Sequence, residues 1–172
     1  KNIEEAGPLA DFFKANSIKN VAIVVSNDTW GESQIKGFTK AIESVGGKVV
    51  MQEKISYGSD KDVMPTVVAK ITKANVDSVL WTGYDEAGTI LVKRLQEQNF
   101  NKPVVAAASI MRGLVNRGLI NLRPEDRLYT INIPMDATFR AKYIAAYKQE
   151  PGISADSAYD GLKILVKGIQ AG

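Results

Sequence analysis

Val21-Ala-Ile-Val-Val25 is an uninterrupted apolar run, rich in β-branched residues, and it predicts a buried strand. Ser26-Asn-Asp-Thr-Trp-Gly31 follows as a loop, and apolar residues then recur at helical spacing at Ile35, Phe38 and Ile42. The stretch therefore predicts a strand, a short loop and a helix that covers the strand. Repeated units of this kind build parallel sheets, because each helix returns the chain to the edge of the sheet where the next strand begins.

The same alternation continues along most of the chain. Two further helices are predicted by apolar residues at helical spacing, one from Val63 to Ala74 and one from Ala87 to Leu95. The four other strands are predicted at Lys48–Gln52, Asp77–Thr82, Pro103–Ala107 and Arg127–Ile133. We therefore expect a three-layer α/β fold, in which a mainly parallel five-stranded sheet of order 2-1-3-4-5 carries helices on both faces.

The alternation stops after Ile133. Two amphipathic helices follow with no strand between them, and the first carries Phe139, Tyr143 and Tyr147 on one face. Such an aromatic stripe indicates helix packing rather than a cofactor site. The sequence therefore predicts two parts, residues 1–133 and residues 134–172.

The composition is that of a globular protein, with 45% hydrophobic and 24% charged residues among 172. The chain has no histidine and no cysteine, which excludes disulfides, Cys/His zinc sites, cysteine nucleophiles and Ser-His-Asp triads. Its 22 basic and 19 acidic residues give a net charge of +3 and are scattered along the chain, so nucleic acid is not an expected partner. No run approaches the roughly 18 apolar residues of a membrane-spanning helix.

Phosphate-binding motifs are missing as well. The sequence has neither a Gly-x-x-x-x-Gly-Lys-Ser/Thr loop nor a Gly-x-Gly-x-x-Gly turn after a strand, and Gly83 and Gly88 do not have the right spacing. We therefore expect no cofactor, no metal ion and no enzymatic activity. A small α/β enzyme would have to rely on Asp28, Asp85 or Glu86 together with a lysine or a tyrosine.

Two loops are candidate binding loops, because in an open parallel sheet ligands bind beyond the carboxyl ends of the strands, where the strand order reverses. Ser26–Gly31 and Gly83–Gly88 each carry an aromatic residue, a carboxylate and a glycine at the start of a helix. Trp30 and Tyr84 offer apolar cover for a small molecule, and the helix N-termini favour an anion such as a carboxylate. In the alternative interpretation the rings only wall the loops, and four polar residues serve as helix caps: Asp28, Thr29, Asp85 and Glu86.

A third candidate loop follows the fourth strand. Ala106-Ala-Ala-Ser-Ile-Met-Arg-Gly113 has small residues that allow a ligand to approach, and Ser109 and Arg112 could donate hydrogen bonds to it. Arg112 could hold a carboxylate through two parallel bonds, or it could be a solvated residue at the start of a helix. Trp81 lies within the third strand and is expected in the core.

Three segments in a fixed order resemble the type I solute-binding proteins of ABC importers, in particular the branched-chain amino-acid receptor family. They are Val21–Ser33, Ala41–Val50 and Asp77–Gly88. The resemblance implies a receptor in which two α/β lobes, joined by crossing strands, close over a small solute. It implies that residues 1–133 form the second, ligand-binding lobe, that residues 134–172 return to the first lobe, and that this first lobe lies outside the chain.

The resemblance also assigns site residues. Trp30 and Tyr84 match positions where the family places aromatic residues in the cleft. Ser109 falls near a position where branched-chain amino-acid receptors use a glutamate to hold the ligand ammonium. Asp85 could supply the missing negative charge, or the solute could lack an ammonium group. Together with Thr29 and Arg112, these residues are the candidate ligand-binding set.

The function implied by the resemblance is the solute-binding component of an ABC importer for an amino-acid-like or carboxylate-bearing solute. The expected partners are the solute, the first lobe and a membrane permease, and the expected location is periplasmic or extracellular, with a lipid anchor compatible with the full-length protein. Apolar surface on residues 133–172 could also drive homo-oligomer formation. The alternative is a ligand-sensing domain of a regulator or receptor, because one fold serves several functions.

Overall fold

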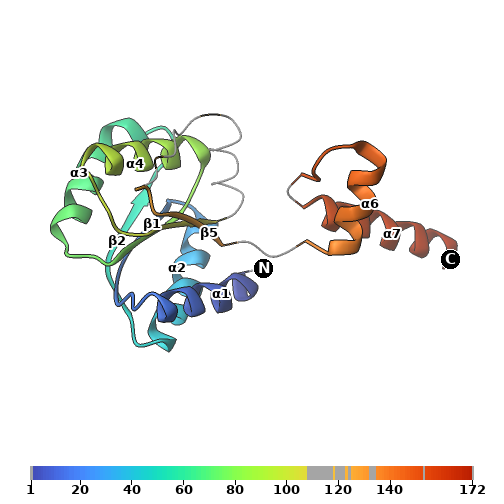
Figure 1. Ribbon diagram of the computed structural model, residues 1–172, viewed down its shortest axis with the longest axis horizontal. Helices are drawn as coiled ribbons and strands as arrows, with labels where there is room; N and C mark the ends of the chain where they lie inside the picture. Colours follow the sequence, from blue (N-terminus) through green and yellow to red (C-terminus); the bar gives the residue numbers. More distant parts are fainter. Residues whose placement is uncertain are drawn as a thin grey trace. The chain divides into compact units, whose positions relative to one another are not determined.

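The computed structural model divides the chain into two compact units, Lys1–Asn132 and Ile133–Gly172 (Figure 1). The residues that it describes are 2–107, 118, 123, 125–131, 135–152 and 154–171. The first unit holds the sheet, and the second consists of helices.

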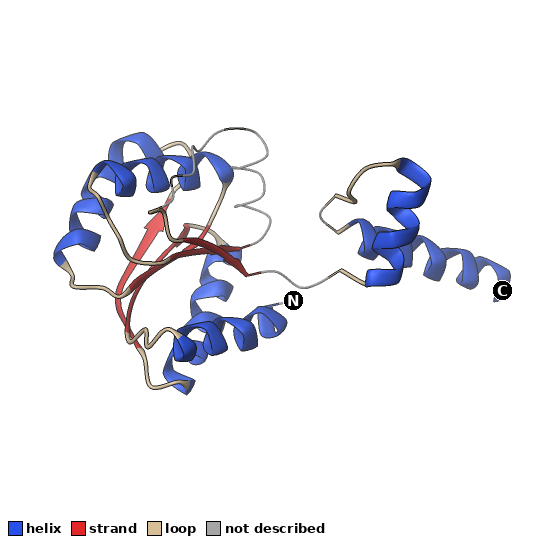
Figure 2. Cartoon of the chain, in the orientation of Figure 1, coloured by secondary structure: helices blue, strands red, loops and turns tan. Residues whose placement is uncertain are grey.

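The first unit is built around one five-stranded sheet in which every pair of neighbouring strands is parallel (Figure 2). The strand order β2-β1-β3-β4-β5 confirms the order predicted from the sequence. The strands are β1 (Asn20–Ser26), β2 (Lys48–Ile55), β3 (Ser78–Thr82), β4 (Val104–Ala107) and β5 (Leu128–Ile131).

Helices cover both faces of this sheet, as the alternation of strands and helices predicted. On one face, α3 (Asp60–Lys73) and α4 (Asp85–Glu97) bury a core with alternate residues of the strands. On the other face, α1 (Asn2–Ala15) and α2 (Thr29–Ser44) bury a second core with the intervening residues (Figure 1). The three-layer α/β architecture is therefore confirmed.

Trp81 on β3 is the largest side chain of the first core. Only 1% of its surface is exposed, which confirms that it is a core residue. It packs with buried residues of both neighbouring helices, such as Met64 on α3 and Leu91 on α4. This packing fixes the end of β3 against the helix layer.

The carboxyl ends of all five strands lie at one edge of the sheet, because the strands run in the same direction. β1 pairs directly with β3, up to the partners Val25 and Thr82, and the strand order reverses between these two strands. The loops that leave β1 and β3 therefore start side by side. These are the two loops that the sequence singled out.

The second unit contains α6 (Ala137–Tyr147) and α7 (Ala155–Ala171). Its rings contact one another: Phe139 lies 5.8 Å from Tyr143 and 5.5 Å from Tyr159, measured between ring centroids. None of the helical residues described in this unit is buried, and several large apolar side chains of α7 are exposed. In the described parts of the chain, no helix has the length and apolar character needed to cross a bilayer.

Candidate functional site

The loop after β1 is a tight turn between strand and helix. Asp28 is the N-cap of α2, where its Oδ1 accepts hydrogen bonds from the Gly31 backbone N–H at 2.7 Å and from the Ser26 hydroxyl at 3.0 Å. Gly31 passes so close to the strand that an added Cβ would stand 2.0 Å from the Ser26 carbonyl oxygen. Asp28 is therefore a helix cap, and Thr29 begins α2 as an exposed residue.

The loop after β3 is equally constrained. A Cβ on Gly83 would stand 2.4 Å from two carbons of the Trp81 ring, so the backbone there lies directly on the buried indole. Tyr84 occupies the N-cap position of α4 without a capping bond from its side chain, and its ring stays half exposed. Asp85 and Glu86 form the first turn of α4, where negative charge stabilises a helix N-terminus.

A hydrogen bond joins the two loops. The Tyr84 hydroxyl donates to Asp28 Oδ2 at 2.8 Å, while Oδ1 of the same carboxylate holds the start of α2. The Gly31 backbone hydrogen bond is the main cause that lowers the pKa of Asp28, and the bonds from Tyr84 and Ser26 lower it further. The Asp28 carboxylate in turn raises the pKa of the Tyr84 hydroxyl. Asp28 therefore stays ionised and keeps the Tyr84 ring at a fixed position.

Three aromatic rings gather at this edge of the sheet. The Trp30 and Tyr84 ring centroids lie 6.1 Å apart, and the Tyr57 and Tyr84 centroids lie 6.4 Å apart in an edge-to-face arrangement. Their exposed fractions are 38% for Trp30, 51% for Tyr84 and 82% for Tyr57. We call Trp30, Tyr57 and Tyr84 the aromatic cluster. It is an apolar surface open to solvent.

The structure brings together Trp30 and Tyr84, the two rings that the sequence placed in one site. Tyr57 was missed, because the segment Tyr57-Gly-Ser-Asp60 predicted only a turn and a cap. Tyr57 could have been predicted from its position just after β2, the strand that lies next to β1. Ser109 and Arg112 lie outside the described residues.

Replacing Asp28 with alanine is expected to lower the free energy of unfolding by about 1–2 kcal/mol at neutral pH, because the α2 N-cap and the link to Tyr84 are both lost. The pKa of Asp28 is lowered in the folded state, so its contribution is complete above the ordinary carboxyl pKa and disappears as the pH falls through the folded pKa. Urea unfolding of the wild-type and Asp28→Ala proteins from about pH 7 down to about pH 2 measures this difference. The control Asp28→Asn keeps an acceptor without the charge, and we expect a smaller loss. Equal stability of the Asp28→Ala and wild-type proteins at neutral pH would contradict the capping role.

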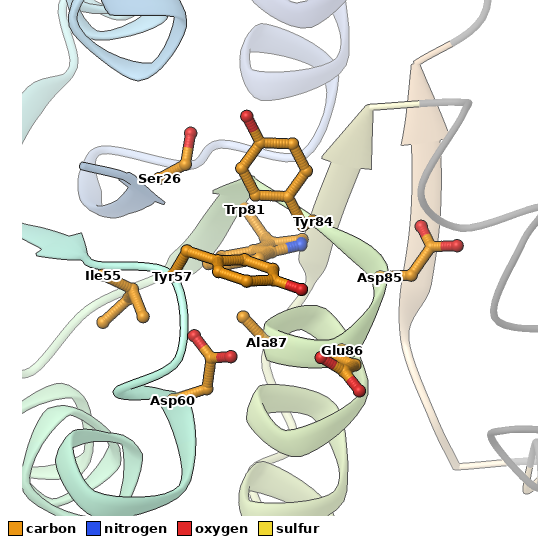
Figure 3. Close-up of a pocket in the computed structure, with 9 residues that line it drawn as sticks. All are labelled: Ser26, Ile55, Tyr57, Asp60, Trp81, Tyr84, Asp85, Glu86 and Ala87. Atoms are coloured by element: carbon orange, nitrogen blue, oxygen red, sulfur yellow. The ribbon is translucent and has the colours of Figure 1, made fainter. Parts of the chain in front are cut away.

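A cavity of about 370 Å³ opens beside Tyr84 (Figure 3). It lies among the ends of β1, β2 and β3 and the starts of α3 and α4. We call it the Asp60 cavity. Its lining residues are Ser26, Ile55, Tyr57, Asp60, Trp81, Tyr84, Asp85, Glu86 and Ala87. Of the predicted ligand-binding residues, Tyr84 and Asp85 line this cavity.

The electrostatics of the Asp60 cavity are set by carboxylates. Asp60 is only 8% exposed, and burial, followed by the charge of Glu86, raises the pKa of its carboxyl group. Within the described part of the chain, no group of three His, Cys, Asp or Glu side chains is arranged to hold a metal ion. The cavity and the aromatic cluster can bind a small molecule through rings, carboxylates and helix N-termini.

A family model described as periplasmic binding protein matches residues 2–172. The chain belongs to the periplasmic binding protein family. No curated protein matches it. Residues 21–33, 41–50 and 77–88, on which the resemblance to solute-binding proteins rested, all lie within the match.

Solved structures share the fold of this periplasmic binding protein. A putative branched-chain amino acid ABC transporter protein from Rhodospirillum rubrum superposes with a TM-score of 0.75 at 20% identity, over 95% of this chain and 48% of that one. A solute-binding protein of an ABC transporter from R. palustris, in complex with benzoate, gives a TM-score of 0.73 at 20% identity, over 94% and 45%. An ABC transporter substrate-binding protein from Desulfitobacterium hafniense, in complex with Leu, gives 0.70 at 18% identity, over 100% and 50%. The chain therefore spans about half the length of each of these proteins.

Proposed function

We propose that this chain is the second lobe of the extracytoplasmic solute-binding component of an ABC importer. The observation that carries the proposal is the exposed aromatic cluster at the carboxyl edge of the sheet, where Tyr84 and Trp30 lie 6.1 Å apart on loops joined through Asp28. Large exposed rings at the point where the strand order reverses are suited to cover a small molecule. Membership in the periplasmic binding protein family supports the same role.

The first lobe supplies the other wall of the site. This chain spans about half of each similar solved structure, which leaves room for a second lobe of comparable size. Closure of the two lobes by hinge motion would bury the aromatic cluster against the solute and shift the receptor to its closed form. The closed form would then dock on a membrane permease at the periplasmic or extracellular side.

The proposed solute is amino-acid-like or carries a carboxylate. Leucine and benzoate, bound in two of the similar structures, both contain a carboxylate group. In this chain the N-terminus of α4 lies beside Tyr84, whose side chain makes no capping bond there, and the backbone N–H groups of a helix N-terminus favour an anion. The site needs no covalent chemistry, because rings, backbone groups and lobe closure are sufficient for reversible binding.

The test is a thermal-shift screen of the full-length protein, with both lobes, against amino acids, amides and aromatic acids. A solute present at about one hundred times its dissociation constant adds about 2.7 kcal/mol to the free energy of unfolding. We expect at least one carboxylate-bearing solute to raise the melting temperature in this way. A complete panel without any shift would contradict the proposal.

The second unit is proposed to pack on the first lobe. Four apolar residues of α7 form a stripe at helical spacing, and each is at least 44% exposed: Leu162, Leu165, Val166 and Ile169. Apolar stripes of this kind are normally covered in the folded protein. Residues 134–172 would therefore return to the first lobe and connect the two halves of the receptor.

Without a first lobe, the stripe on α7 is expected to make the 172-residue chain self-associate. Replacing Leu165 and Ile169 with lysine is expected to restore a monomer, because the two charges would be buried in any contact through this face. Sedimentation velocity measures the mass of both proteins. A wild-type chain that stays monomeric at tens of micromolar would contradict this prediction.

A further inference from the structure

The two oxygens of the Asp28 carboxylate have different partners. Oδ1 accepts hydrogen bonds from the Gly31 backbone N–H at 2.7 Å and from the Ser26 hydroxyl at 3.0 Å, and it caps α2. Oδ2 accepts a hydrogen bond at 2.8 Å from the hydroxyl of Tyr84, which lies 56 positions away in the sequence. A helix N-cap needs only one acceptor oxygen. The bond to Tyr84 is therefore not required to begin α2.

The side chain of Tyr84 is held at both ends. At the backbone end, the preceding Gly83 lies directly on the Trp81 ring, where an added Cβ would stand 2.4 Å from two ring carbons. At the other end, Asp28 holds the hydroxyl. Between these two points the ring is 51% exposed and contacts the two other rings of the aromatic cluster. The bond to Asp28 therefore fixes a ring that is otherwise open to solvent.

The hydroxyl proton of Tyr84 is used within the protein. A phenol has one proton to donate, and here Asp28 accepts it. The negative charge of the carboxylate strengthens this bond and raises the pKa of the hydroxyl, so the proton stays on Tyr84. Figure 3 shows the hydroxyl on the opposite side of the Tyr84 ring from Asp60. Tyr84 therefore offers a solute its ring and no hydrogen-bond donor.

We propose that Asp28 is a positioning residue of the solute site, which does not contact the solute and holds the Tyr84 ring in the orientation that binds it. This inference rests on the proposed function, because it requires a solute on the aromatic cluster. A side chain that is fixed beforehand loses less freedom when a ligand binds, so the bond increases affinity. Its expected share is a factor of about three to ten in the dissociation constant.

The replacement Asp28→Ser separates the helix cap from the bond to Tyr84. Serine is as good an N-cap as aspartate, but its single, shorter-reaching oxygen cannot serve both partners. Asp28→Asn keeps both, because the amide oxygen can cap the helix while the amide N–H₂ donates to the Tyr84 oxygen. Tyr84→Phe keeps the ring and removes the hydroxyl. Asp136→Ser is the matched control, because Asp136 caps α6 through a bond of the same kind, from the Phe139 backbone N–H at 2.7 Å.

Calorimetry on the full-length protein measures affinity in each variant. The probe is the compound of the amino-acid, amide and aromatic-acid panel, starting with leucine and benzoate, that gives the largest thermal shift with the wild type. We expect Asp28→Ser and Tyr84→Phe each to weaken binding about threefold to tenfold. The double variant should bind no more weakly than either single one, because both remove the same bond. Asp28→Asn should bind within about twofold of the wild type, and Asp136→Ser should bind as the wild type does.

A second readout tests the bond itself and does not respond to a helix cap. The pH titration of the Tyr84 ring carbon that bears the hydroxyl, followed by ¹³C NMR, gives the pKa of this group. Asp28→Ser should lower that pKa toward its ordinary value, because the carboxylate that raises it is gone, and Asp136→Ser should not change it. Melting temperatures of the two Asp→Ser variants should stay close to that of the wild type, because both caps are kept.

The outcomes distinguish this inference from the proposed function. A solute that the wild type, Asp28→Ser and Tyr84→Phe bind equally tightly would support the receptor and overturn the role of Asp28. Losses that add in the double variant would mean that the Tyr84 hydroxyl contacts the solute directly, which also overturns it. An unchanged Tyr84 pKa in Asp28→Ser would show that the bond does not form in solution. A panel without any thermal shift would contradict the receptor and this inference together.

Discussion

Replacement of Trp81 with alanine is expected to lower the free energy of unfolding by about 3–5 kcal/mol. The indole is 1% exposed and is the largest fully buried side chain among the described residues. It packs in the core between the sheet and the helices α3 and α4, and the Gly83 backbone lies directly on it. Its removal would leave a cavity under the loop that carries Tyr84, so solute binding should be lost together with stability.

Urea unfolding followed by far-UV circular dichroism measures this effect, because the signal does not depend on tryptophan. Trp81→Phe should cost less, about 1–2 kcal/mol, since it keeps most of the apolar contact. Trp30→Ala is the matched control. Trp30 is 38% exposed, and we expect its loss to change stability by only about 0.5 kcal/mol. A Trp81→Ala protein as stable as Trp30→Ala would show that the core does not depend on the indole.

Replacement of Gly31 with alanine is the second large effect, with an expected loss of about 2–4 kcal/mol. The added Cβ would stand 2.0 Å from the Ser26 carbonyl oxygen and 3.0 Å from its carbonyl carbon, so the backbone itself must move. Gly31 also donates the hydrogen bond that Asp28 accepts at the start of α2. The substitution therefore disrupts the turn between β1 and α2, including the helix cap, at the position that carries Trp30.

Gly7→Ala is the control for this prediction. Gly7 lies inside α1 and is exposed, and a Cβ built on it meets no atom within 4 Å outside its chain neighbours and its own helix. Alanine favours a helix interior over glycine, but Pro8 follows and disfavours helical backbone at a preceding residue that carries a Cβ. Because the two effects oppose each other, Gly7→Ala should change stability by less than about 1 kcal/mol. A loss of stability in Gly31→Ala no larger than that in Gly7→Ala would mean that the turn after β1 is looser than its contacts indicate.

The sheet could be predicted because its central strands are apolar runs with clear helical segments between them. β1 and β3 are buried almost throughout, and their predicted bounds agree with the observed ones within a residue at each end. β2 is longer than predicted and continues to Ile55. It is an edge strand whose residues alternate between exposed and half-buried up to Lys54, so Glu53 and Lys54 gave no apolar signal before the buried Ile55.

The pairing of Trp30 with Tyr84 could also be predicted, because the carboxyl ends of neighbouring parallel strands meet at one edge of the sheet. The place of Tyr57 could not, because its contact with Tyr84 depends on how far the loop after the edge strand reaches across the sheet. The burial of Asp60 could not be predicted from the sequence either. An acidic residue in the first turn of a helix is normally a solvated residue that stabilises the helix, and only the packing of α3 beside α4 encloses this one.

If the aromatic cluster is one wall of a solute site, the most direct test is to replace Tyr84 with alanine in the full-length protein. The affinity is then measured for the solute that the thermal-shift screen identifies. Calorimetry should give a dissociation constant at least about tenfold weaker than that of the wild type, because the ring that links Trp30 and Tyr57 is lost. Val50→Ala, at an exposed apolar residue of β2, should bind as the wild type does. Equal affinity of the wild-type and Tyr84→Ala proteins would contradict a solute site at this edge of the sheet.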